Sequence, residues 1–432
     1  MTAIRFHHRT ARRFRPGLSV CTVAFALAAP VAAQAQAQDQ AQQFCVTDPA
    51  AVTARAAITL PDTPLPEALA DALDAAARGA LDGAAAPGII AGVVTPEGRW
   101  SGAWGVADPE TGAAMEVGMH TRVGSVTKTF TGTALMQLAD AGKLSLDDTI
   151  DQYVPGVPNG DIITLRHLAS MTSGLLSYTQ ADPFLDQFFA DPSLHYTPQD
   201  LLDFAFPGSP IFAPGEEFNY SNTNTVLLGL VIEQVAGQDI DTVLTSMILD
   251  PLGLTQTIGP DGAALMPEPY PQGFTLQGDA ATPAAPSNAT HWDPSWGWTA
   301  GGMISTLDDL LIYGRSLGTG KGLLGAEAQQ QRLRSFPEPA GYGIAMGCVD
   351  GWVGHTGELP GYNTTVFYDT TTDTTVVVQA NSDIPSGDCG DEDVLPDNPA
   401  DLACSSPASR VFEALSVALG HPFSMTPTDS AE

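Results

Sequence analysis

Basic residues are scarce in this chain. Only 17 of its 432 residues are lysine or arginine, against 49 aspartates and glutamates, and the formal net charge is −32. A surface of this kind repels nucleic-acid phosphates and anionic lipid headgroups, so neither is expected as a partner. The only lysines are Lys128, Lys143 and Lys321. Because burying a charged amine is costly, a lysine in apolar surroundings is a candidate for a chemical role.

An apolar run long enough to span a membrane is also missing. The most apolar stretch, Leu18 to Ala33, has about sixteen residues, whereas a spanning helix needs roughly twenty. It follows a cluster of arginines and ends in small residues, which is the pattern of a cleavable signal peptide over residues 1–33. We therefore predict a secreted or periplasmic protein without a membrane anchor.

Cysteines are few and widely spaced. Cys21 leaves with the signal, and Cys45, Cys348, Cys389 and Cys404 remain, an even set for an oxidising compartment. The chain has no Cys-x-x-Cys, and no histidine pair lies near these cysteines, so we expect no metal site and no cofactor. Four cysteines permit three pairings. We prefer Cys348 with Cys389 and Cys45 with Cys404, because a bridge from Cys348 would brace the strand that follows it.

Composition and periodicity divide the rest of the chain into a linker, one catalytic body and a tail. An extension over residues 34–63 and a polar tail over 424–432 flank the body, residues 64–423. Residues 251–295 are rich in proline and glycine and predict a long irregular segment that could shape a cleft. The regular elements that we predict are helices over 64–81, 125–142, 223–236 and 408–419, with hairpins from 88–95 and 99–108 and from 364–368 and 374–380.

Ser125 and Lys128 form a Ser-x-x-Lys pair. Residues three apart on a helix lie one turn apart on the same face, so the amine can reach the hydroxyl. A serine hydroxyl is a weak nucleophile until a base takes its proton, and a lysine whose pKa is lowered by burial can act as that base. The motif alone is common, but Lys128 is the only lysine that follows a serine by three residues, and it begins an apolar helix.

Two further segments carry groups that suit acyl transfer. Tyr220 and Asn222 precede the helix predicted over 223–236, where a phenol can relay a proton and a carboxamide can bind a substrate amide. The same triplet also occurs as a simple helix cap. His355-Thr356-Gly357 precedes the second hairpin, where an edge strand could line a cleft, although a lone histidine is often structural.

The order Ser-x-x-Lys, Tyr-x-Asn and His-Thr-Gly resembles that of the serine β-lactamase and DD-peptidase superfamily. The resemblance extends over roughly Pro64 to Gly420, and the flanking segments narrow it to the class C β-lactamase-type branch. These segments are Val123–Thr131, Gly142–Asp148, Leu168–Leu175, Pro251–Leu254, Ala300–Thr306 and His355–Tyr362.

This resemblance implies an α/β fold of the α+β type. A five-stranded antiparallel sheet from residues 64–125 and 297–423 would be flanked by helices, and residues 126–296 would form an all-helical subdomain. Ser125 would form the acyl-enzyme, and Lys128 and Tyr220 would shuttle protons. The substrate-binding residues would be Asn222, His355, Thr356, Gly357 and Glu358. The backbone N–H groups of Ser125 and Glu358 would form the oxyanion hole.

His355 bears on the choice of substrate. Class C β-lactamases usually carry Lys-Thr-Gly here, and the histidine form resembles exported D-alanyl-D-alanine carboxypeptidases of the same branch. The change removes a permanent cation, and no arginine lies between Arg334 and His355 to replace it. A neutral imidazole and the Thr356 hydroxyl can still donate hydrogen bonds to a carboxylate, and His355 could gain charge when the anion binds.

Three functions remain open at this point. The leading one is a D-alanyl-D-alanine carboxypeptidase or related D-amino-acid peptidase. The others are an esterase or weak β-lactamase on the same scaffold, and a non-catalytic envelope-binding protein. The expected partner is a small-molecule or peptide substrate, such as a peptidoglycan stem peptide, a β-lactam or an ester, and the expected state is a monomer. A Gly-x-Ser-x-Gly match at 314–318 is disfavoured as a nucleophile elbow, because the preceding residues 307–313 predict a helix where the elbow needs a strand.

Overall fold

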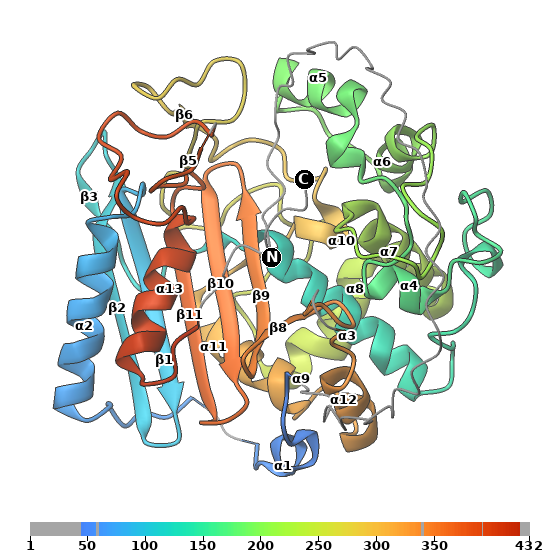
Figure 1. Cartoon of the computed structure of the whole chain (residues 1–432), viewed down its shortest axis with the longest axis horizontal. Helices are drawn as coiled ribbons and strands as arrows, with labels where there is room; N and C mark the ends of the chain where they lie inside the picture. Colours follow the sequence, from blue (N-terminus) through green and yellow to red (C-terminus); the bar gives the residue numbers. More distant parts are fainter. Residues whose placement is uncertain (1–44, 58–59, 338–340, 391, 424–432) are drawn as a thin grey trace, which may run out of the picture.

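The computed structural model describes residues 45–57, 60–337, 341–390 and 392–423. The predicted signal peptide, the linker before residue 45 and the predicted tail lie outside the described residues. An antiparallel sheet forms one side of the molecule, and the helices from the middle of the chain lie on the other side (Figure 1). This is the β-lactamase/transpeptidase-like arrangement that the motifs predicted.

The sheet and two small ribbons contain eleven strands in the described residues. They are β1 (Gly88–Thr95), β2 (Gly98–Asp108), β3 (Ala113–Ala114), β4 (Thr121–Arg122), β5 (Phe274–Thr275), β6 (Ser287–Asn288), β7 (Ile304–Ser305), β8 (Gly347–Val349), β9 (Trp352–Leu359), β10 (Tyr362–Asp369) and β11 (Thr374–Ala380). β4 pairs with β7 and β5 pairs with β6, apart from the main sheet.

The described residues also form α-helices, and α3 to α9 follow one another between β4 and β5. They are α1 (Pro49–Ala54), α2 (Glu67–Leu81), α3 (Thr127–Asp140), α4 (Leu165–Ala169), α5 (Asp182–Ala190), α6 (Pro198–Ala205), α7 (Asn222–Ala236), α8 (Ile240–Leu244), α9 (Asp250–Leu252), α10 (Trp298–Gly301), α11 (Leu307–Thr319), α12 (Ala326–Leu333) and α13 (Pro407–Ala418). Within the part of the chain that the structure describes, none of them is both long enough and apolar enough to cross a bilayer.

The main sheet has the order β3-β2-β1-β11-β10-β9-β8. Its five long strands, from β2 to β9, are the five that were expected, and the short β3 and β8 extend the two edges to seven. β8 pairs with β9 only between Trp352 and Gly354. No described strand covers residues 355–359 on that side, so this half of β9 presents a free edge.

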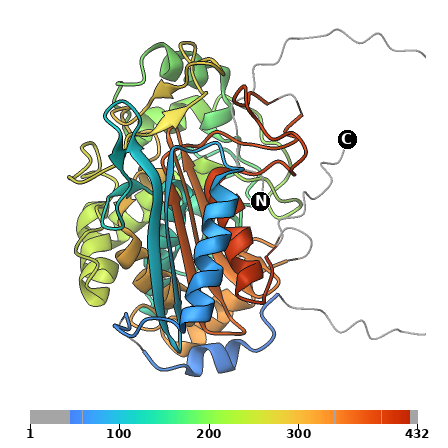
Figure 2. The same cartoon turned by 90° about the vertical axis from the view of Figure 1, so that its left-hand side faces the viewer.

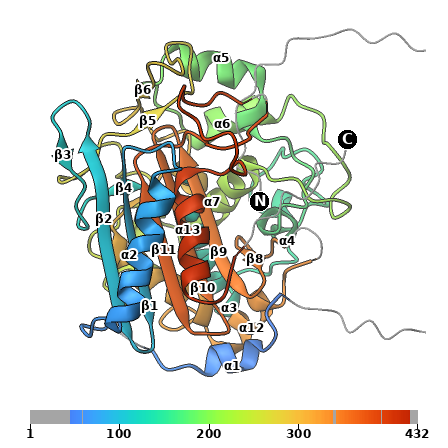
Figure 3. The same ribbon diagram turned by 60° about the vertical axis from the view of Figure 1, so that its left-hand side comes forward.

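Both faces of the sheet are buried, and every residue of its central strands β1, β11 and β10 is buried. On β11, Val376 and Val378 pack toward α2 and α13, whereas Val377 belongs to the core on the opposite face. α2 and α13 lie side by side over one face (Figures 2 and 3), and α11 packs on the other. The helices from the two ends of the body, α2 and α13, thus cover one layer of the core against the sheet.

Most predicted elements are confirmed within a few residues. The first helix begins at Glu67 instead of residue 64, because Pro64 is extended and forms a bridge with Arg99 at the end of the sheet. Residues 251–295 contain only the short α9 and the β5–β6 ribbon, as their composition predicted. The Gly-x-Ser-x-Gly match lies entirely inside α11, so no strand leads into Ser316 and this is not a nucleophile elbow.

The predicted disulfide pairing is wrong. The structure joins Cys45 to Cys348 and Cys389 to Cys404. The second pair closes a local loop whose flanks are already held together by the bridges Ser386–Ser405 and Asp388–Ala403. Cys348 lies on the edge strand β8, where α1 brings Cys45 alongside by packing on α11 and α12.

Candidate active site

Ser125 lies at the entrance to α3, in a single 3₁₀ turn over Gly124–Val126 that packs directly against β9. The contact leaves no room for side chains. A Cβ on Gly124, whose φ is +52°, would lie 2.4 Å from the backbone nitrogen of Glu358, and one on Gly357 would lie 1.9 Å from the carbonyl oxygen of Val123. Both glycines are therefore required for the approach of the turn to the strand.

Lys128 is fully buried beneath Ser125. Its Nζ lies 2.9 Å from Ser125 Oγ and donates a hydrogen bond to the carbonyl oxygen of Ala300 at 2.6 Å. Burial lowers the pKa of Lys128 well below its ordinary value of 10.5, which favours the neutral amine. The predicted helical spacing has therefore placed a potential base within reach of the hydroxyl.

Tyr220 covers the other side of the serine. Its ring centroid lies 4.9 Å from Lys128 Nζ, and its hydroxyl shares a hydrogen bond with the Ser125 side chain. Burial raises the pKa of Tyr220 more than this hydrogen bond lowers it, so the phenol keeps its proton at neutral pH. The three residues that sequence analysis singled out for catalysis thus meet around one oxygen.

The close approach of the Ser125 turn to β9 also brings two backbone N–H groups together. A Cβ on Gly357 would lie only 3.1 Å from the nitrogen of Ser125, and one on Gly124 would lie 2.4 Å from the nitrogen of Glu358. Glu358 N therefore lies beside the Ser125 turn. The resemblance implied these two N–H groups as the oxyanion hole, and that role stays a prediction.

His355 is buried on β9 and is held at both ring nitrogens. Nδ1 contacts the carbonyl oxygen of Thr356, which can only accept, so Nδ1 carries the proton and Nε2 accepts from the hydroxyl of Tyr342 at 3.2 Å. Burial, followed by the charge of Lys128, lowers the pKa of His355 to about 3. The imidazole is therefore neutral near pH 7, and charging it on anion binding would require breaking its bond from Tyr342.

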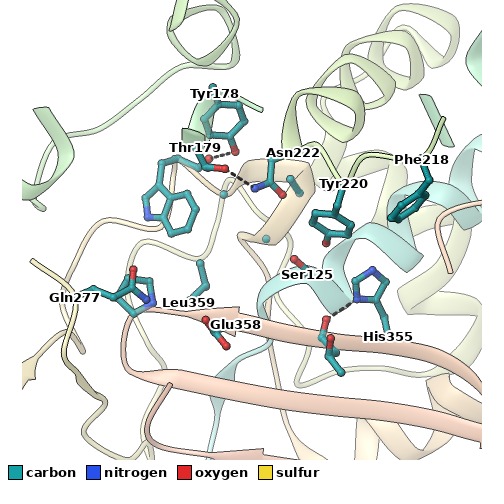
Figure 4. A pocket seen from close by; sticks show the side chains of 16 residues that line it. Ser125, Tyr178, Thr179, Phe218, Tyr220, Asn222, Gln277, His355, Glu358 and Leu359 are labelled. Carbon is teal, nitrogen blue, oxygen red and sulfur yellow. Dashed lines mark hydrogen bonds between the residues drawn. The ribbon is translucent and has the colours of Figure 1, made fainter. Parts of the chain in front are cut away.

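Asn222, Thr356 and Glu358 also line the cleft (Figure 4). Asn222 begins α7, and its Nδ2 donates to Thr179 Oγ1 at 3.1 Å, which fixes the carboxamide. Thr356 and Glu358 lie partly exposed on the free half of β9, and Gly357 lies between them against the serine turn.

Sequence reasoning missed several residues in and behind the cleft. Gln277 and Ala300 line the cleft, and Tyr342 lies behind it against His355. None of the three has an individual signal, although Tyr342 lies between two glycines and Ala300 lies in a segment that had the family pattern. The other wall residues without a predicted role are Tyr178, Thr179, Phe218, Trp296, Gly297, Gly301, Leu359 and Pro360.

Known proteins resemble this chain in sequence and in fold. The family model described as Beta-lactamase matches residues 73–395. Putative penicillin-binding protein PbpX of Bacillus subtilis (strain 168) is 27% identical over 264 residues, which cover 60% of this chain and 61% of that protein. Penicillin-binding protein 4* of the same organism is 34% identical over 137 residues, which cover 31% of this chain and 29% of that protein. The chain therefore spans less than two thirds of the length of these curated relatives.

Solved structures match a larger share of this chain than the curated relatives do. A D-stereospecific amidohydrolase from Streptomyces sp. is 30% identical, with a TM-score of 0.65, over 74% of this chain and 95% of that one. The D-amino acid amidase from Ochrobactrum anthropi SV3 is 23% identical, with a TM-score of 0.69, over 82% and 100% of the two chains. At 23% identity, the similarity to the amidase from Ochrobactrum anthropi SV3 shows a shared fold.

Proposed function

The chain belongs to the Beta-lactamase family of serine hydrolases, and from this premise we propose that it is an exported enzyme that cleaves D-amino-acid peptides or amides through an acyl-enzyme on Ser125. D-alanyl-D-alanine carboxypeptidase activity is one form of this chemistry. The names of the penicillin-binding relatives and of the D-stereospecific amidohydrolase support the substrate class. Two disulfides support export, because such bonds persist in oxidising compartments.

The observation that carries the proposal is the 2.9 Å contact between Lys128 Nζ and Ser125 Oγ in a buried environment. A neutral lysine amine has a lone pair that can accept the serine proton. Since burial lowers the pKa of Lys128, the neutral form is present at lower pH than for an ordinary lysine. The pair is therefore suited to making a serine nucleophile.

The reaction follows from the positions of these groups. Ser125 Oγ attacks the scissile carbonyl carbon while its proton passes to Lys128, and the carbonyl oxygen takes negative charge facing the N–H groups of Ser125 and Glu358. The Tyr220 hydroxyl then protonates the leaving amine, and the phenolic proton is replaced from Lys128. Water subsequently hydrolyses the ester on Ser125, with the same groups acting in reverse.

Ester hydrolysis, with weak β-lactamase activity, is a second candidate function. An activated ester needs the nucleophile and the oxyanion hole but no anchor for a carboxylate. Among the described residues that line the cleft there is no lysine or arginine, and His355 is neutral. This lining favours substrates that do not depend on a fixed cation.

Covalent labelling by a fluorescent penicillin tests the nucleophile. We expect the wild-type protein to be labelled and Ser125→Ala to remain unlabelled. Ser316→Ala is the matched control, because Ser316 lies within α11 at the rejected elbow motif, and this variant should be labelled normally. A wild-type protein inert to penicillins and to activated esters would leave only the non-catalytic envelope-binding alternative.

Substrate comparison tests the peptidase assignment. Release of D-alanine from a diacyl-lysyl-D-alanyl-D-alanine peptide and of D-phenylalanine from its amide is compared with hydrolysis of p-nitrophenyl acetate and nitrocefin. We expect kcat/KM for at least one D-amino-acid substrate to exceed that for nitrocefin. Turnover of both D-substrates far below that of the ester would replace the peptidase with the esterase.

A further inference from the structure

The carbonyl oxygen of Ala300 sets the direction of the Lys128 amine. Lys128 Nζ donates to this oxygen at 2.6 Å and lies 2.9 Å from Ser125 Oγ. A neutral amine has two hydrogens and one lone pair. When one hydrogen points to Ala300, the lone pair can point to the serine hydroxyl, whose proton it has to accept. The position of the Ala300 carbonyl therefore bears on acylation.

Ala300 lies in the short helix α10, which begins at a strained residue. Trp298 has a φ of +32°, a region that is disfavoured for a bulky side chain. It is buried, and Gly302 N closes the helix by donating to the carbonyl oxygen of Trp298 at 2.7 Å. A strained backbone of this kind persists only where the surrounding structure holds it. The position of α10 therefore depends on contacts with its neighbours.

Trp298 is held from two sides. α10 packs against α7 (Figure 1), and a Cβ added to Gly229 of α7 would lie 2.7 Å from Cζ3 of the Trp298 ring. On the other side, Trp298 Nε1 donates a hydrogen bond to Asp261 Oδ1 at 2.8 Å. The contact with Gly229 fixes the depth of the ring, and the bond to Asp261 fixes its direction.

Asp261 is in turn held by α8 and by the β4–β7 ribbon. The side chain of Asp241, on α8, accepts from the backbone nitrogens of Asp261 at 3.1 Å and of Gly262 at 2.8 Å. Ile258 and Ile304 exchange backbone hydrogen bonds at the start of the same loop. Asp261 is exposed and is not among the residues that line the cleft. Its carboxylate thus has a fixed place outside the site.

We propose that Asp261 is a positioning residue for the acylation of Ser125. Through its hydrogen bond to Trp298, Asp261 holds α10 in place. The Ala300 carbonyl then lies where it can orient Lys128 toward the serine. The inference rests on the proposed acyl-enzyme. Because Asp261 lies outside the cleft, its loss should slow the chemical step and leave substrate binding nearly unchanged.

The pre-steady-state burst of p-nitrophenol from p-nitrophenyl acetate tests this role, because it separates the acylation rate constant from the dissociation constant of the ester. We expect Asp261→Ala to lower the acylation rate constant about three- to tenfold, as for the loss of one hydrogen bond, with the dissociation constant nearly unchanged. Asp261→Asn keeps an acceptor oxygen for Trp298 Nε1 and should restore most of the wild-type rate.

Asp74→Ala is the matched control. Asp74 Oδ1 accepts from Nε1 of the buried Trp100 at 2.9 Å, so this variant loses the same kind of hydrogen bond between α2 and β2. It should acylate at the wild-type rate. An unchanged acylation rate constant in Asp261→Ala, or an equal loss in Asp74→Ala, overturns the inference.

A double-mutant cycle tests the path through the indole. Trp298→Phe keeps an aromatic ring and removes the N–H donor, so it should slow acylation about as much as Asp261→Ala. The double variant should be no slower than either single variant, because both changes remove the same hydrogen bond. Effects that multiply in the double variant would show that Asp261 does not act through Trp298 and would overturn the inference.

Hydrogen exchange measured by mass spectrometry separates this inference from the proposed function, because it needs no turnover. Asp261→Ala should speed exchange of the Trp298–Gly302 amides about three- to tenfold, whereas Asp261→Asn and Asp74→Ala should leave it unchanged. If the wild-type protein is inert to the ester and to penicillins, the acyl-enzyme proposal fails, and exchange alone decides whether Asp261 holds α10. Unaltered exchange in Asp261→Ala overturns the inference.

Discussion

The hydroxyl of Tyr342 donates a hydrogen bond to Nε2 of His355, and the two rings meet edge to face with their centroids 5.6 Å apart. Tyr220 packs on both of them, at 6.0 and 6.1 Å between ring centroids. The neutral histidine is thus part of the support for the phenol beside Ser125. Its hydrogen bonds explain why it is unsuited to binding an anion.

Removal of the Tyr342 hydroxyl should weaken this support. We expect Tyr342→Phe to lose about 1 kcal/mol in the free energy of unfolding, the usual value of one hydrogen bond. Because Tyr342 positions Tyr220 without touching substrate, kcat should fall about three- to tenfold and KM should change little. Tyr153→Phe is the control, since it also loses a hydroxyl hydrogen bond, to Asp148, but away from the cleft. Equal kcat values for the two variants would contradict a positioning role.

Lys128→Met should slow acylation strongly and remove a pH dependence of stability. Burial lowers the pKa of Lys128 in the folded protein, whereas the unfolded chain keeps a value near 10.5. Between these two values the unfolded state binds more protons, so wild-type stability rises with pH by up to about 1.4 kcal/mol per pH unit. The rise ends at about pH 10.5, where the unfolded chain also loses the proton.

Denaturant unfolding from pH 7 to 10 measures this slope. Lys128→Met should lack the contribution, whereas Lys143→Met, at an exposed position after α3, should retain it. Acylation by p-nitrophenyl acetate should fall by about 10²- to 10⁴-fold in Lys128→Met, the usual contribution of a general base. A slope identical to that of the wild type would show that Lys128 is not desolvated in solution.

His355 should make the protein sensitive to acid. Its pKa is lowered to about 3 in the folded protein, and its ordinary value is 6.5. As pH falls from 6.5 toward 3, the unfolded chain takes up a proton that the folded protein does not, so stability decreases by up to about 1.4 kcal/mol per pH unit. His355→Asn should have a shallower decrease in unfolding free energy between pH 6 and 4. His195→Asn, at an exposed position, should decrease like the wild type.

The two disulfides should differ in their effect on activity. Cys45–Cys348 closes a separation of 303 residues, and Cys348 N donates to the carbonyl oxygen of Gly341, next to Tyr342. Replacing this pair by serine should cost about 2–5 kcal/mol of stability and should also lower kcat. Replacing Cys389 and Cys404, which close only 15 residues, should leave kcat unchanged. Thermal unfolding with steady-state kinetics of both double variants provides the test, and equal kcat values would contradict it.

The features that could be predicted from the sequence depend on residues that are close together along the chain. Ser125 and Lys128 lie three residues apart at the start of α3, so the spacing predicted that their side chains meet, and the structure has them 2.9 Å apart. Apolar runs and turn residues gave the two hairpins in the same way. The meeting of Tyr220 with this pair is a contact between segments 95 residues apart, and only the resemblance of the ordered motifs to a known family predicted it.

Contacts that depend on packing could not be predicted. Tyr342 reaches His355 only because the turn before β8 folds back along the edge of the sheet, through the bridge between Tyr342 and Gly347. The charge state of His355 depends on how completely these layers exclude water. The disulfides were mispaired for the same reason, since the position of α1 beside β8 is set by tertiary contacts and leaves no local pattern.

The connectivity of the disulfides has a consequence for biogenesis. In order along the chain, Cys45 pairs with the next cysteine, Cys348, and Cys389 pairs with Cys404. If the polypeptide is translocated with its amino end first, an oxidase that joins each cysteine to the next one to emerge produces the native bonds directly. Maturation then requires an oxidant but no isomerase.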